Sequence, residues 1–217
     1  MLSFSVEEFM LVLEQYNTSI WPMQIVAYLL VILVLFFSFK SYKYSQKSIL
    51  VILSFLWLFN GVVFSLIFYA PSHFFGYVFG ICCIVQGLIF LFGLKETDLL
   101  ARVESSVYSI TGIILVLYAA AGYQIFGYYL GHVYPKFFPV GLVPCPTTIF
   151  TFGIFLIIPK KIPVKYYVIP SIVALGGFLA AYNGIYEDIG LIISGLFGTY
   201  LIIRRNKQFT KQEKKAV

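Results

Sequence analysis

Long apolar runs constrain this sequence more than any other feature. They cover residues 20–39, 48–69, 74–94, 105–126, 137–158, 164–182 and 189–203, and a helix that spans a bilayer needs about 20 such residues. Charged residues make up only 11% of the chain, against roughly a quarter in soluble domains. So few charges cannot cover a water-soluble surface. The sequence therefore predicts an all-α integral membrane protein with about seven transmembrane helices.

The basic residues indicate the direction of these helices. If successive runs alternate in direction, 14 of the 15 Lys and Arg residues fall on one side of the membrane. They are Lys40, Lys43, Lys47, Lys95, Arg102, Lys160, Lys161, Lys165, Arg204, Arg205, Lys207, Lys211, Lys214 and Lys215, and only Lys136 falls on the other side. Cytoplasmic loops carry the excess of Lys and Arg. We therefore expect an inner (plasma) membrane protein with its N-terminus outside and its C-terminus in the cytoplasm.

The chain reads as one transmembrane helical domain over residues 1–217. Residues 20–203 form the seven-span bundle, and residues 204–217 form a basic cytoplasmic tail. Residues 1–19 carry a short surface helix, because Ser5 and Glu8 fit a capping box and apolar residues follow at helical spacing over 5–15. This helix lies on the membrane surface or packs on the bundle. It is not a secretory signal, because it has Glu7 and Glu8 where basic residues would stand.

The fifth run is broken by prolines. Pro139, Pro144 and Pro146 prevent its first half from forming a regular helix, so the helix is expected over 147–158 with Pro146 at its first position. Such a helix is about 18 Å long, which places Thr147 roughly 12 Å below the outer boundary of the hydrocarbon core. Irregular backbone at that depth either lines a wet cavity or is a plug buried in protein. Both alternatives stay open from the sequence.

Several polar residues fall near the same depth. Counting from the nearest cytoplasmic Lys or Arg at 1.5 Å per residue places them in one outer-half layer, with His132, Tyr134 and Cys145 on the connection above or within it. The candidate ligand-binding residues are therefore Asn60, His132, Tyr134, Cys145, Thr147, Thr148, Glu187 and Asp188. Acidic residues at membrane depth are often functional. The alternatives are that Glu187 and Asp188 cap the last helix and that Asn60 only bonds a neighbouring helix.

Cys145 and His132 raise two further readings. Together they could form a metal or haem pair, or a Cys–His nucleophile oriented by Glu187 or Asp188. Two ligands without a third are a weak metal signal, and a Cys between two prolines more often serves packing. The sequence therefore predicts no metal, no cofactor and no catalytic residue. Nucleic-acid binding is excluded, because the basic residues sit between apolar runs and form no polar face.

Several segments of the chain match the pattern of one known family. Residues 144–153, with the sequence Pro-Cys-Pro-Thr-Thr-Ile-Phe-Thr-Phe-Gly, are the most specific of them. Others are residues 16–22, 24–28, 57–63, 77–80 with Gln86, and 131–135, with Ile169-Pro170 and Glu187-Asp188. By these segments, which cover nearly the whole chain, the chain resembles the uncharacterised prokaryotic membrane proteins grouped as domain-of-unknown-function family 6064. The resemblance implies a multi-pass membrane protein without an assigned activity. It supplies no catalytic residues.

Three functions fit these features. The first is transport or conduction of a small solute or ion through an outer-half polar cavity. The second is a membrane-embedded enzyme or redox protein that uses Cys145 and His132, and the third is an accessory subunit whose basic tail contacts anionic lipid. We favour transport over catalysis. The expected partners are the lipid bilayer and a small solute or ion, and the sequence indicates no oligomeric state.

Overall fold

The computed structural model describes residues 5–40, 42, 44–95 and 106–215, and in these residues it contains helices and no strands. Arg102 and Lys43, which entered the charge count, lie outside the described residues. The order is α1 (Val6–Ser19), α2 (Met23–Phe39), α3 (Ser45–Phe59), η1 (Asn60–Tyr69), α4 (Phe75–Phe92), η2 (Gly93–Lys95), α5 (Val107–Leu117), η3 (Tyr118–Gly122), α6 (Tyr123–Tyr129), α7 (Pro144–Ile157), α8 (Val164–Tyr182) and α9 (Asp188–Lys215).

Four continuous helical stretches are long and apolar enough to cross a membrane. They are Ser45–Tyr69, Phe75–Phe92, Val107–Tyr129 and Val164–Tyr182, and α1 with α2 adds a fifth if this pair, bent by 86°, counts as one. Large apolar side chains on their outer faces are exposed, such as Ile81 (61%) and Ile114 (60%). Contiguous exposed apolar surface of this kind marks contact with lipid or another protein. The protein is therefore a helical chain suited to a membrane.

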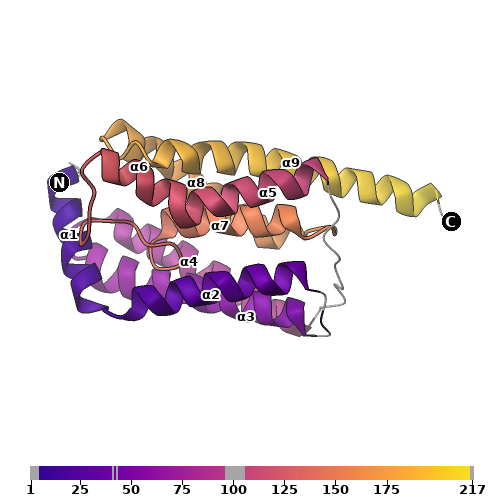
Figure 1. Cartoon of the computed structure of the whole chain (residues 1–217), viewed down its shortest axis with the longest axis horizontal. Helices are drawn as coiled ribbons and strands as arrows, with labels where there is room; N and C mark the ends of the chain where they lie inside the picture. The colour runs from indigo at the N-terminus through magenta and orange to yellow at the C-terminus, as the bar shows by residue number, and fades with distance from the viewer. Residues whose placement is uncertain (1–4, 41, 43, 96–105, 216–217) are drawn as a thin grey trace.

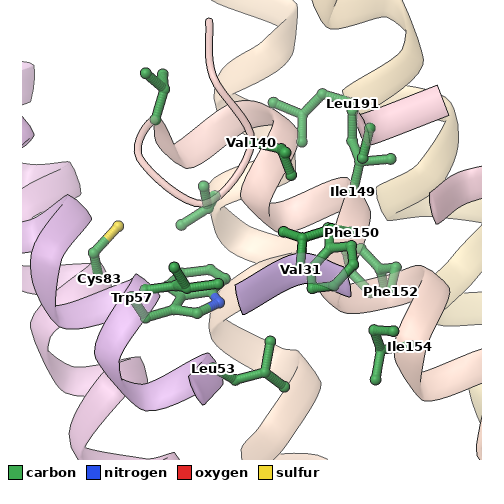
Figure 2. Close-up of a cluster of buried hydrophobic side chains, with 14 of the residues drawn as sticks. Val31, Leu53, Trp57, Cys83, Val140, Ile149, Phe150, Phe152, Ile154 and Leu191 are labelled. Atoms are coloured by element: carbon green, nitrogen blue, oxygen red, sulfur yellow. The ribbon is translucent and has the colours of Figure 1, made fainter. Parts of the chain in front are cut away.

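Helix α7 is the centre of the bundle. It packs against α2, α3, α5, α8 and α9, and its residues are almost all buried. Figure 2 shows Ile149, Phe150 and Phe152 of α7 beside Val31 of α2 and the α3 residues Leu53 and Trp57. The indole Nε1 of Trp57 donates a hydrogen bond to Thr151 Oγ1 at 3.0 Å. A short helix is stable here because other helices shield it on every side.

The helix ends differ from the sequence prediction in informative ways. Helix α7 begins at Pro144, not at Pro146 or Thr147, because the first-turn N–H groups of a helix have no intrahelical partner and proline loses nothing there. Helix α9 continues through the expected tail to Lys215, and Figure 1 shows its end projecting beyond the bundle. Helix α1 buries Phe9, Leu13 and Tyr16, so it packs on the bundle.

Candidate functional site

Two adjacent carboxylates lie buried where α9 begins. Glu187 is 0% exposed and Asp188 is 1% exposed. Glu187 Oε1 lies 2.5 Å from His132 Nδ1, and the His132 side chain is 14% exposed. His132 therefore connects the buried pair to the end of the bundle that carries α1 and the connection between α6 and α7 (Figure 1).

Asp188 is held by groups from two other helices. Its Oδ1 accepts a hydrogen bond from the Tyr123 hydroxyl at the start of α6, and the Cys145 thiol at the start of α7 is its second side-chain partner. The positive end of the α9 dipole also favours a carboxylate at this position. Gly127 leaves room for the neighbouring carboxylate, since a Cβ there would lie 2.8 Å from Glu187 Oε1. Three chain segments therefore meet at this acidic pair.

The two carboxylates of the acidic pair have a single basic neighbour among the described residues. Within the described residues, neither Glu187 nor Asp188 contacts a Lys or Arg, and His132 is the one ionisable base beside them. Glu187 Oε2 is buried without a hydrogen-bond partner. Buried charges are normally paired, and acidic residues at membrane depth mark proton or ion pathways. Two carboxylates therefore face one base, and a proton or a small cation would supply the positive charge that is lacking.

A cavity of about 60 Å³ adjoins Asp188. Asp188 and Cys145 form its polar end, and most of its wall is apolar. Five aromatic residues line it: Phe9, Phe64, Tyr69, Phe75 and Phe79. A smaller hollow beside it is lined by Glu8, Phe9, Tyr69 and Ser72, among others. Phe9 and Tyr69, whose ring centroids are 5.0 Å apart, line both spaces and so stand between them.

Asn60 and Thr147 have a different role. The Asn60 amide donates to Leu56 O at 2.7 Å and to Gly141 O at 2.8 Å. Thr147 Oγ1 donates to Val143 O at 2.7 Å and accepts from Gly141 N at 2.9 Å. These bonds satisfy the irregular backbone before α7, where the φ angle of Gly141 is +86°. The two side chains therefore fix the buried irregular segment before α7, called the plug below, and neither lines the cavity.

Thr148 and Tyr134, the other predicted ligand-binding residues, do not line the cavity beside Asp188. Thr148 is fully buried on α7, and its Oγ1 has no hydrogen-bond partner among the described residues. Tyr134 is 56% exposed and packs on Phe137. His132 and Cys145 both lie in the described part of the chain, and no hydrogen bond joins them. His132 contacts Glu187, and Cys145 contacts Asp188. Sequence reasoning missed Tyr123 and Phe9, since nothing distinguishes them from the many other aromatic residues.

Metal binding receives no support from this geometry. In the described ranges, no three His, Cys, Asp or Glu side chains are grouped so as to hold a metal ion. A nucleophilic thiolate is stabilised by positive neighbours, whereas the partner of Cys145 is a carboxylate. The arrangement favours binding of a positive charge over thiol chemistry.

Comparison with known proteins identifies the family. A family model described as a family of unknown function, DUF6064, matches residues 6–214. The chain belongs to DUF6064. The match includes the acidic pair, the plug and all the aromatic residues of the cavity, so this DUF6064 site lies entirely within the family region. No curated protein and no solved structure matches the chain.

Proposed function

We propose that this protein transports or conducts small cations across a membrane, and that the cation binds in the cavity beside Asp188. The observation that carries the proposal is a buried carboxylate without a Lys or Arg partner that faces an aromatic-lined cavity. Aromatic faces attract cations, and cages of such rings recognise ammonium groups. The cavity is smaller than the about 150 Å³ that holds benzene. Its ligand is therefore a small cation such as a protonated amine.

The small hollow next to the cavity marks the side from which a cation would enter. Glu8 lines this hollow, and Phe9 and Tyr69 separate it from the cavity. Glu7 is a second acidic residue in the first turn of α1 and is exposed. Acidic groups at the mouth of an apolar cleft raise the local concentration of cations. A cation would pass Phe9 and Tyr69 to reach Asp188.

The His132–Glu187 contact supports exchange of a proton for the cation. His132 is partly exposed and Glu187 adjoins Asp188, so a proton displaced from the acidic pair has a route to the surface. Cation binding is therefore expected to release a proton.

We further propose seven spans with the N-terminus outside. Beyond the four long helices, α2 and α9 expose large apolar side chains as lipid-facing helices do, for example Leu29 (56%) and Ile193 (58%). Helix α7 is shielded from lipid by its neighbours, so its shortness is tolerated. The uneven distribution of Lys and Arg supports the direction. In this orientation the acidic pair and the cavity lie in the outer half.

Cysteine labelling tests this topology. In a variant that lacks Cys82, Cys83 and Cys145, new cysteines are placed at the exposed positions Ser72 and Lys161. We expect a membrane-impermeant maleimide to label Ser72→Cys on intact cells and Lys161→Cys only after permeabilisation. The reverse pattern would contradict the orientation. Labelling of both positions from one side would contradict the number of helices between them.

Uptake into proteoliposomes tests the function. We expect vesicles that contain the purified protein to accumulate radiolabelled methylammonium at least about tenfold faster than protein-free vesicles, which measure passive leakage, because Asp188 stabilises the desolvated cation. Glucose, a neutral solute, serves as the control and should show no protein-dependent uptake. Equal uptake of methylammonium and glucose, or uptake of neither, would reject the proposal.

A further inference from the structure

At the opposite end of the bundle, Arg205 of α9 is almost fully buried. The residue is 3% exposed, although the sequence placed it in a solvated tail. Its Nη1 donates to Leu156 O at 3.0 Å and its Nη2 donates to Phe155 O at 2.6 Å. These acceptors are carbonyls of the last turn of α7, which have no intrahelical donor. They fix the guanidinium in position.

The positive charge of Arg205 is not neutralised by a carboxylate. No described Asp or Glu forms an ion pair with Arg205, and its Nε is buried without a hydrogen-bond partner. The α7 carbonyls carry only partial negative charge. Burial lowers the pKa of Arg205 to about 10, so the guanidinium stays protonated at neutral pH. Buried charges are normally paired, and this one lacks a full counter-charge.

Arg205 lines a cavity of about 170 Å³. The cavity is lined by residues from the end of α7, the start of α5 and the last turns of α9. Figure 1 shows the end of α7 and the start of α5 at the same end of the bundle. Its other polar walls are Ser106, Tyr108, Ser109, Gln208 and Gln212, and no described acidic residue lines it. The Tyr108 hydroxyl donates to Gln208 Oε1 at 2.9 Å, which leaves the Gln208 amide N–H groups to donate elsewhere. The Tyr108 ring also packs on the guanidinium.

We propose that this cavity binds a phosphate-bearing anion. A guanidinium, an amide donor and the N-terminus of α5 together present positive charge and hydrogen-bond donors to one space, as oxoanion sites do. A cavity that exceeds the about 150 Å³ needed for benzene accommodates a phosphate group. In the topology proposed above, the cavity opens at the cytoplasmic side. Phosphate there comes from an anionic lipid headgroup or from a free phosphate in solution.

Thermal unfolding in a neutral detergent tests the site and separates the two sources. One arm adds inorganic phosphate against chloride at equal ionic strength, and the other adds phosphatidylglycerol against phosphatidylcholine. We expect the wild-type protein to gain thermal stability in at least one arm. A response to inorganic phosphate identifies a free phosphate site, and a response to phosphatidylglycerol alone identifies a lipid site. No response in either arm overturns the proposal.

Two variants make the test specific. Arg205→Gln should weaken the apparent affinity for the responding phosphate compound at least about tenfold, whereas Arg204→Gln, which removes the same charge from an exposed position, should leave it within about twofold. Gln208→Glu places a negative charge at the cavity and leaves the α7 carbonyl contacts in place, so it should abolish the response even if Arg205→Gln is unstable. Equal losses in Arg204→Gln and Gln208→Glu would show unspecific charge attraction and reject the site.

Discussion

Replacing Asp188 with Asn is expected to lower methylammonium uptake at least about 30-fold. Asp188 is the one described carboxylate that lines the cavity, and a neutral amide cannot offset the charge of a desolvated cation. Removing one partner of a buried charge pair costs about 2 kcal/mol or more, which corresponds to that factor. Asn keeps the shape of the side chain and an oxygen that accepts from Tyr123. The measurement is the initial uptake rate at low methylammonium concentration.

Glu14→Gln is the matched control for Asp188→Asn. Glu14 on α1 also carries a carboxylate, but its side chain is 42% exposed and pairs with Lys136 at 3.3 Å. Exposed pairs contribute little, so uptake by this variant should stay within about twofold of wild type. Size-exclusion profiles check that both variants are folded. Equal uptake by Asp188→Asn and the wild type would mean that the cation binds elsewhere.

Replacing Gly153 with Val is expected to destabilise the protein by about 3 kcal/mol or more. Gly153 of α7 faces Gly112 of α5, since a Cβ on Gly112 would lie 2.6 Å from Gly153 O. A Cβ on Gly153 would lie 2.8 Å from Gly112 O and 2.7 Å from a methyl carbon of Val116. Overpacking a tight core typically costs about 1–3 kcal/mol, and a backbone atom cannot move aside as a side chain does. Thermal unfolding in detergent measures the loss.

Val107→Ile provides the comparison for Gly153→Val. Val107 is on α5 and is 73% exposed, so an added carbon atom there meets no packed neighbour. Its stability should change by less than about 0.5 kcal/mol. If Gly153→Val were as stable as Val107→Ile, α5 and α7 would not be packed through their glycines.

The sequence predicts a helix well where the apolar run has the same ends as the helix. Helix α8 begins and ends where its apolar run does, because charged or turn-forming residues flank it. The N-cap at Ser5 is confirmed, since Ser5 Oγ accepts from Glu8 N. By contrast, the apolar run of α9 ends at Ile203, but the helix continues to Lys215, because charged residues remain good helix formers in water.

The site is harder to predict than the helices, because the depth of a residue in the membrane does not say toward which neighbour its side chain points. Counting 1.5 Å per residue along each helix predicts Asn60, Thr147 and Asp188 in one layer. In the structure, Asn60 and Thr147 bond the plug before α7, whereas Asp188 lines the cavity. Which face of a helix turns inward depends on packing between helices, and runs that are apolar all round carry no such signal. Gly112 and Gly153 were missed for the same reason.

Proton release on cation binding is the most direct test of a cation site at the acidic pair. Methylammonium chloride is added to the detergent-solubilised protein in unbuffered solution near neutral pH, and the released protons are measured with a pH indicator. We predict about one proton released per cation bound to the wild type, and none for Asp188→Asn. Binding without proton release in the wild type, or the same release in both proteins, would contradict a cation that replaces a proton at Asp188.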